Sequence, residues 1–218
     1  MPLTGKGQQA RTPARSVANF LPPRASLKAL REAAGGWQGC DLYRSATQTV
    51  FGEGSRRASL VLVGEQPGDQ EDRQGHPFVG PAGRLLDQAL QDAGIPREAL
   101  YITNAVKHFK WVARGKRRLH QRPREGEIDA CLPWLLAEVR VIRPHAVVCL
   151  GATAARAAFG RIVRLKDVRG RFSVTPLAQE TFVTVHPSAV LRLHTPEREH
   201  EYGRLVADFR QLRRYVAI

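Results

Sequence analysis

Short apolar runs alternate with amphipathic stretches along this chain, and this alternation limits the folds open to it. The apolar runs are residues 59–63, 100–103, 146–150 and 181–185, each bounded by turn residues as buried strands are. Apolar residues at helical spacing fall in residues 81–93, 128–139, 152–159 and 202–212, with Gly94 as a C-cap for the first stretch. Strands that alternate with helices indicate right-handed crossovers between parallel strands. We therefore predict an α/β fold: a single-domain α/β/α sandwich with a central, four-stranded, mostly parallel sheet.

The first part of the chain differs in composition from the rest. Residues 1–31 carry six basic residues and no acidic one, and Gly, Pro and Gln are frequent among them. Such a composition favours a disordered segment, with an Arg-rich targeting peptide as the alternative. We predict a basic, disordered arm over residues 1–24 and one folded domain over residues 25–218.

The overall charge indicates a polyanionic partner. The chain has 34 Lys and Arg against 20 Asp and Glu, a formal net charge of +14. A solvated basic surface is the ordinary explanation of positive charge, but an excess of this size in a globular enzyme favours nucleic acid. Three cysteines form no disulfide framework, and no apolar run approaches the roughly 20 residues that cross a bilayer. We therefore expect a cytoplasmic protein of the bacterial nucleoid, without a membrane partner.

Chemically informative residues follow the predicted strands. Residues 64–72 (GEQPGDQED) come after the first strand, Asn104 after the second and His186 after the fourth. Because the carboxyl ends of parallel strands share one edge of a sheet, Glu65, Asn104 and His186 should converge on one cleft. The Asn104 amide matches a nucleobase edge, and Phe78 could stack on a base. Taken singly, Asn104 fits a loop cap, His186 a structural role and Phe78 the core; their convergence favours a site.

A second segment, residues 107–124, carries eight basic residues and no acid, interleaved with Phe109 and Trp111. Charge runs are usually solvated faces, but this one leaves directly from the second predicted strand. We predict an internal basic loop beside the cleft that contacts phosphates. Within it, His120 lies among cations that favour its neutral form, and a neutral imidazole is a nucleophile or a base.

Four ordered motifs in the chain resemble the uracil-DNA glycosylase superfamily, family-4 type. They are residues 64–68 (GEQPG), 77–83 (PFVGPAG), 103–107 (TNAVK) and 186–188 (HPS), and the resemblance runs from about Cys40 to the C-terminal helix. Glu65-Gln66 and residues 116–120 (KRRLH) resemble, more narrowly, the X-type subgroup. Members of that subgroup have this basic loop with its histidine and become covalently attached to the uracil-derived site in DNA.

The resemblance implies a role for each residue of these motifs. Catalysis would rest on His120, Glu65 and His186; uracil would be bound by Gln66, Gly68, Asp69, Phe78, Asn104 and His186; DNA would be contacted by Lys116, Arg117, Arg118, Ser188 and Arg192. Phe78 would stack on the flipped uracil, Asn104 would read its Watson–Crick edge, and His186 would donate to O2. The backbone amides of Gln66 and Gly68 would line the pocket. The implied partner is uracil-containing DNA, preferably single-stranded, and the enzyme is expected to be a monomer.

The family also carries a [4Fe–4S] cluster, and the resemblance assigns three of its ligands to Cys40, His108 and Cys131. Trp37 stands where the family has its fourth ligand, the first cysteine of a CxxC pair. Three ligands, or a substitute fourth, could hold the cluster, or the site could be empty. Without the resemblance, the wide spacing of these residues fits buried free thiols equally well, as we expect of Cys149.

Three interpretations of the function follow. The first is a single-turnover uracil-DNA glycosylase that cleaves the N-glycosidic bond and is then linked to C1′ through His120, with Glu65 as the partner of the imidazole. The second is a conventional glycosylase that uses water and releases free uracil with turnover. The third is a DNA-binding module without enzymatic activity. Glu65 and His120 together favour the first.

Overall fold

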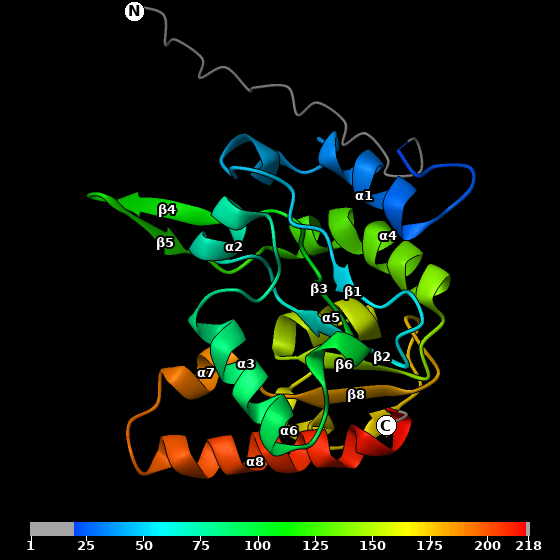
Figure 1. Ribbon diagram of the computed structural model, residues 1–218. Helices are drawn as coiled ribbons and strands as arrows, with labels where there is room; N and C mark the ends of the chain where they lie inside the picture. The colour runs from blue at the N-terminus through cyan, green and yellow to red at the C-terminus, as the bar shows by residue number, and fades with distance from the viewer. Residues whose placement is uncertain (1–19, 217–218) are drawn as a thin grey trace, which may run out of the picture.

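The central sheet has six strands in the order β1-β3-β2-β6-β8-β7 in the computed structural model, which describes residues 20–216 (Figure 1). The strands are β1 (Glu53–Gly54), β2 (Leu60–Gly64), β3 (Tyr101–Asn104), β6 (Ala146–Leu150), β7 (Phe172–Ser173) and β8 (Thr181–Thr184). The four central strands are parallel, and the two edge strands are antiparallel to their neighbours. The predicted α/β fold is confirmed, but the sheet has six strands rather than four. The edge strands are two residues long, too short for an apolar pattern to mark them.

Helices cover both faces of this sheet (Figure 1). They are α1 (Leu27–Gly35), α2 (Asp69–Gln74), α3 (Pro81–Asp92), α4 (Glu125–Ile142), α5 (Ala152–Phe159), α6 (Leu165–Val168), α7 (Pro187–Leu191) and α8 (Glu197–Leu212), with short 3-10 helices η2 (Asp41–Arg44), η3 (Arg97–Ala99) and η4 (Arg213–Tyr215). All five residues of β2 are buried. Val61 and Val63 pack into one core with α1, α4 and α5, whereas Leu60 and Leu62 pack into the other with α3 and α8. Burial on both faces explains why the parallel strands are continuous apolar runs.

The predicted helices are present with small shifts at their ends. The helix predicted over residues 81–93 is α3, whose first residue is Pro81, and Gly94 follows its C-cap with a φ of 71°. A glycine fits this place because a left-handed backbone is strained for other residues. Within residues 20–216, no helix has the length and hydropathy of a membrane span.

The basic segment differs from its prediction as a loop. Residues Trp111–Arg114 (β4) and Arg117–His120 (β5) pair as a separate antiparallel hairpin that projects beside α2 (Figure 1). Gly115, with a φ of 58°, is in the turn between them. Since His120 is the last residue of β5, its backbone position is set by a ladder of hydrogen bonds rather than by an irregular loop.

The predicted N-terminal arm lies mostly outside the described residues. The description begins at Phe20, and both Phe20 and Leu21 pack against the core that holds α1 and α4. Ser26 begins α1 by accepting a hydrogen bond from the backbone N–H of Ala29 at 3.1 Å.

Candidate active site

A cavity of about 660 Å³ opens where β2, β3, β6 and β8 end, at the carboxyl edge of the sheet. Among the predicted site residues, those that line it are Glu65, Gln66, Gly68, Phe78, Asn104, His120, His186, Ser188 and Arg192. Asp69, Lys116, Arg117 and Arg118 lie outside it. The volume is within the range of roughly 300–1,000 Å³ that small-molecule sites occupy. The convergence of strand ends on one cleft is therefore observed.

Asn104 ends β3 with its amide oxygen unsatisfied. The residue is 2% exposed, and Oδ1 has no hydrogen-bond partner among residues 20–216. Its neighbour across the register is Gly64, where a methyl group would overlap both Asn104 Oδ1 and the Phe78 ring. A buried acceptor without a donor costs about 1–3 kcal/mol, so such an atom in a cavity indicates a ligand that supplies an N–H.

Phe78 is held in a strained backbone conformation beside the cavity. Its φ is 56°, which is rare for a bulky residue, and its ring is 4% exposed. The ring lies 5.7 Å from that of His186 between centroids, with an interplanar angle of 30°. A methyl group at Gly83 would overlap the Phe78 carbonyl, so α3 can approach this loop only with glycine there. Strain of this kind costs about 1–3 kcal/mol and is typical of functional sites.

Glu71 ties two loops of the cavity together, a role that the sequence did not reveal. This buried carboxylate accepts from the backbone N–H of Gly68 at 3.0 Å and from that of Gly80 at 2.7 Å. The Gly68 amide was expected to line an oxyanion hole. Gly68 does line the cavity, but its N–H already donates to Glu71, so it is not free for a ligand.

His186 is neutral and presents a defined donor. The backbone N–H of Ser188 donates to Nδ1 at 3.1 Å, which leaves the proton on Nε2. Burial lowers the pKa of His186 to about 4, and the positive charge that His120 carries when protonated and the charge of Arg192 act in the same direction. The residue therefore stays uncharged at neutral pH and offers an Nε2–H to the cavity that it lines.

Gln66 fastens the hairpin to the cavity wall. Its side-chain amide donates to the backbone oxygens of Lys110 at 3.2 Å and Gln121 at 3.0 Å, the residues on either side of the hairpin. Its Oε1 accepts from the N–H of Lys110 at 3.2 Å. Both ends of the hairpin are thereby held against the loop that follows β2.

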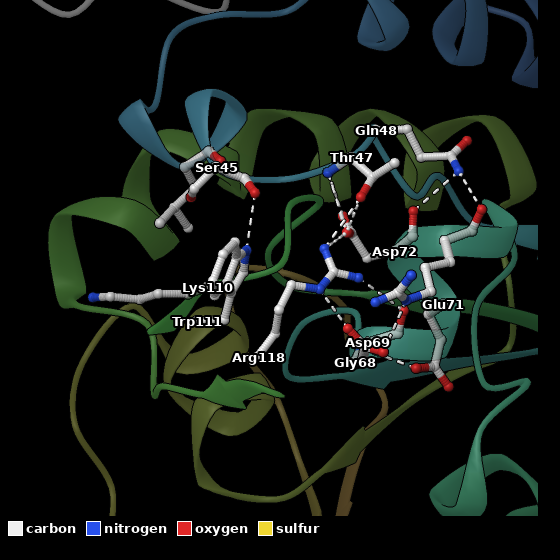
Figure 2. A network of polar contacts seen from close by, with 12 residues as sticks. Ser45, Thr47, Gln48, Gly68, Asp69, Glu71, Asp72, Lys110, Trp111 and Arg118 are labelled. Atoms are coloured by element: carbon white, nitrogen blue, oxygen red, sulfur yellow. Dashed lines mark hydrogen bonds and ion pairs between the residues drawn. The ribbon is translucent and has the colours of Figure 1, made fainter. Parts of the chain in front are cut away.

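Arg118, in strand β5 of the hairpin, forms ion pairs with two acidic residues of α2 (Figure 2). Its guanidinium donates to Asp69 Oδ1 at 2.5 Å and to Asp72 Oδ2 at 2.6 Å, and it lies 5.4 Å from the ring centroids of Phe109 and Trp111. Partial burial alone would raise the pKa of Asp69, but hydrogen bonds from Arg73 and Arg118 outweigh it and lower that pKa. Arg118 was expected on DNA and Asp69 on uracil; the structure instead pairs the two outside the cavity.

His120, at the end of β5, and Glu65 both line the cavity and lie close to each other. His120 Nε2 lies 3.3 Å from Glu65 Oε1, and Glu65 Oε2 accepts from the Thr153 hydroxyl at 2.5 Å. Burial, and then the charge of Arg192, lower the pKa of His120, while Glu65 raises it; the net direction is downward. A neutral imidazole is therefore held with Nε2 beside a carboxylate that can take the proton on this nitrogen, while the other ring nitrogen keeps a free lone pair. This is the arrangement of an activated nucleophile.

Lys107 belongs to the core and not to the basic surface of its segment. Its ammonium and the Glu138 carboxylate are fully buried, 2.5 Å apart, and Nζ also donates to the backbone oxygen of Asn104 at 2.9 Å. Lys110 pairs with Glu127 at 2.8 Å. Together with Arg118, these residues show that three of the segment's eight cations are paired with acids of the protein.

The residues near Trp37 do not fit a four-ligand iron–sulfur cluster. Cys40, Cys131 and His108 are buried, but no group of three such side chains among residues 20–216 is placed to hold a metal ion. Trp37 is 1% exposed, its ring stacks on His108 with centroids 5.6 Å apart, and indole nitrogen only donates. His108 Nε2 is 2.8 Å from the Thr49 hydroxyl. Cubane clusters take four ligands, and here an aromatic ring occupies one position.

The fold and the cavity define an α/β enzyme with a ligand-sized cavity, lined by apolar and polar side chains, at the carboxyl edge of its sheet. Residues 51–210 match the family model described as the uracil DNA glycosylase superfamily. The chain is 34% identical over 190 residues to the type-4 uracil-DNA glycosylase of Pyrobaculum aerophilum, which covers 84% of this chain and 92% of the relative. It is 38% identical over 170 residues to the type-4 enzyme of Thermotoga maritima, covering 78% of this chain and 83% of that one. The chain therefore belongs to the uracil DNA glycosylase superfamily and is an enzyme of the DNA glycosylase class.

Proposed function

We propose that this enzyme removes uracil from DNA and becomes linked through His120 to the C1′ carbon of the resulting site. Members of the X-type subgroup, which its motifs resemble, form such an adduct. The observation that carries the proposal is the pair of His120 Nε2 and Glu65 Oε1, 3.3 Å apart in the cavity that also contains Asn104 and Phe78.

The unsatisfied amide of Asn104 supports uracil as the base. Its Oδ1 would accept from uracil N3–H, and its NH₂ group would donate to O4. Phe78 would lie against the base. A cytosine has no N3–H, so it would leave Oδ1 without a donor in a buried place.

His186 would stabilise the leaving group. Cleavage moves the electron pair of the C1′–N1 bond onto uracil, and much of that charge appears on O2. The neutral His186 can donate its Nε2–H to O2 in the transition state.

Attack of His120 on C1′ completes the reaction. The ring nitrogen of His120 that carries no proton forms a bond to C1′ with its lone pair, and the other nitrogen, Nε2, gives its proton to Glu65. The departing uracil anion holds the electron pair from the broken bond. The product is a neutral N-alkyl imidazole and a protonated Glu65. A neutral alkyl imidazole is a poor leaving group under mild conditions, so we expect the adduct to persist.

Exposed cations around the cavity fit the DNA backbone. Lys116 and Arg117 are exposed at the hairpin turn, and Ser188 and Arg192 lie on the cavity wall. We propose that these residues contact phosphates, whereas Arg118 positions the hairpin from within the protein. Because its substrate is DNA, the enzyme would act at the nucleoid in the cytoplasm. We expect it to act as a monomer.

A denaturing gel tests the covalent step directly. Enzyme incubated with a uracil-containing, single-stranded oligonucleotide should give a shifted band that survives boiling in detergent. His120→Ala should abolish the band, and Glu65→Gln should slow its formation by roughly 10²–10⁴-fold, the range for a lost general base. His200→Ala, which removes an exposed histidine from α8, is the matched control and should behave as the parent chain does.

Two outcomes would count against the proposal, one on the same gel and one in a parallel measurement of released uracil. A band that remains in His120→Ala would exclude His120 as the nucleophile. Free uracil released in molar excess over the enzyme, without a band, would support a conventional glycosylase in which Glu65 positions water.

Single-stranded DNA should be the better substrate. Extrusion of a paired base from a duplex costs a few kcal/mol, and an unpaired base avoids this cost. Rates of adduct formation measured on matched single-stranded and duplex oligonucleotides should differ clearly in favour of the single strand. Equal rates would contradict the preference.

A further inference from the structure

A second hollow of about 640 Å³ adjoins the active-site cavity. Arg122 and Ala152 line both spaces, so the two are neighbours on the protein. The hollow lies over the beginning of α4, the beginning of α5 and the segment that follows α5. The hollow is therefore beside any nucleotide that the cavity holds.

The hollow carries positive charge that the protein does not neutralise. Its nearby acids, Glu125 and Asp129, are both held by Arg156, whose Nη2 donates to them at 3.4 Å and 3.0 Å. Arg122 and Arg124 are exposed on its wall and form no ion pair within residues 20–216. Glu125 and Asp129 are thus paired with Arg156, and Arg122 and Arg124 can bind an anion.

Apolar side chains line the same hollow as these cations. Ile162 is 69% exposed, one of few large apolar side chains so exposed among the described residues, and it lines the hollow with Val163. Free cations beside exposed apolar surface suit a nucleotide, whose phosphate is anionic and whose base and sugar offer apolar faces.

We infer that this hollow binds the nucleotide adjacent to the target nucleotide in a single DNA strand, with Arg122 and Arg124 on its phosphate and Ile162 against its base or sugar. The inference rests on the proposed function, which places the target nucleotide in the neighbouring cavity. It extends that function by giving the enzyme a second nucleotide subsite and a defined path for the strand.

Three oligonucleotides test the subsite: one with uracil in the middle, one with uracil at the 5′ end and one with uracil at the 3′ end. Each terminal oligonucleotide lacks one neighbour of the uracil, so one of the two cannot fill the hollow. We would measure binding and adduct formation with the full chain and with Arg124→Glu and Ile162→Asp. Both residues are exposed, and circular dichroism with melting curves verifies that the variants fold.

Arg140→Glu is the matched control. Arg140 is an exposed residue of the same helix, near its other end. Sixteen residues of α-helix separate it from Arg124, about 24 Å. The change in net charge is identical, so general electrostatics affects both variants alike.

We expect Arg124→Glu to weaken binding of the central oligonucleotide and of one terminal oligonucleotide by about tenfold, with a shallower salt dependence. Binding of the other terminal oligonucleotide should match that of the parent chain, and Arg140→Glu should leave all three unchanged. Ile162→Asp should repeat the pattern of Arg124→Glu.

The subsite would be overturned if the parent chain removes uracil but Arg124→Glu and Ile162→Asp weaken binding of all three oligonucleotides equally. It would also be overturned if neither variant weakens binding of any oligonucleotide. Failure of the parent chain to remove uracil from any oligonucleotide would overturn the proposed function, and this inference with it.

Discussion

Glu65 is the residue whose chemistry depends most on its neighbours. Alone at the end of β2, it would be a carboxylate able to activate water. Thr153 donates to one of its oxygens at 2.5 Å and His120 lies 3.3 Å from the other, so both oxygens have partners from the protein. Its position therefore favours proton transfer with an imidazole over activation of water.

The pH dependence of adduct formation should report His120. In the proposed mechanism only the neutral imidazole attacks, so the rate should fall as the pH drops through the pKa of His120. Burial lowers that pKa first and Arg192 lowers it further, so activity should extend below the ordinary value of about 6.5. Arg192→Ala removes a nearby positive charge and raises the pKa. The acid limb of the single-turnover rate at saturating DNA should therefore move to higher pH.

Arg198→Ala provides the comparison for this shift, because Arg198 is exposed on α8 and does not line the cavity. Its acid limb should coincide with that of the parent chain. An Arg192→Ala profile that is lower in rate but unmoved in pH would mean that another group controls the limb.

The hairpin of β4 and β5 is the element of the site that the sequence predicted least well, because a loop was expected in its place. Its strands were hidden because most residues of β4 and β5 are exposed, so no apolar alternation marks them. The signal that could have found it is Gly115-Lys116 between two four-residue stretches, since glycine with positive φ is typical of tight hairpin turns. The clamp of Arg118 could not be predicted, because it depends on acids some fifty residues earlier in the chain.

The strand ends, by contrast, were predictable from the sequence. Fully buried parallel strands are short apolar runs, and their carboxyl ends must share an edge. That placed Glu65, Asn104 and His186 together. Glu71 was missed because its function is to accept from the two loop amides of Gly68 and Gly80, a contact made only in the folded chain.

The aromatic packing at Trp37 leads to a prediction about iron. We expect the purified protein, after anaerobic treatment with ferrous iron and sulfide, to hold no stoichiometric cluster. Trp37→Cys removes the ring that stacks on His108 and supplies a fourth ligand beside Cys40 and Cys131. It should gain broad visible absorbance and about four iron and four sulfide per chain.

Trp37→Phe is the matched control, because it keeps an aromatic ring and adds no ligand. It should remain colourless and fold as the parent chain does. About four iron and four sulfide per chain in the parent protein would show that a substitute ligand replaces the missing cysteine.

One buried network of hydrogen bonds and an ion pair connects the core of the molecule to the cavity. Glu138 of α4 accepts from Lys107 at 2.5 Å, from the Tyr101 hydroxyl at 2.9 Å and from the Thr103 hydroxyl at 3.0 Å. Lys107 in turn donates to the backbone oxygen of Asn104. The Lys107–Glu138 ion pair thus fixes α4, β3 and Asn104 relative to one another.

Removal of one partner of this ion pair should therefore lower the stability of the fold. Lys107→Met leaves the Glu138 charge buried without its cation, and we expect a loss of about 3–5 kcal/mol in the free energy of unfolding. Glu138→Gln should also destabilise, whereas the double variant should lose less than the sum of the two, because no uncompensated charge remains. Urea unfolding measures these values, and Arg44→Met, at an exposed ion pair, should leave stability almost unchanged. Additive losses in the double variant would show that the pair is not coupled.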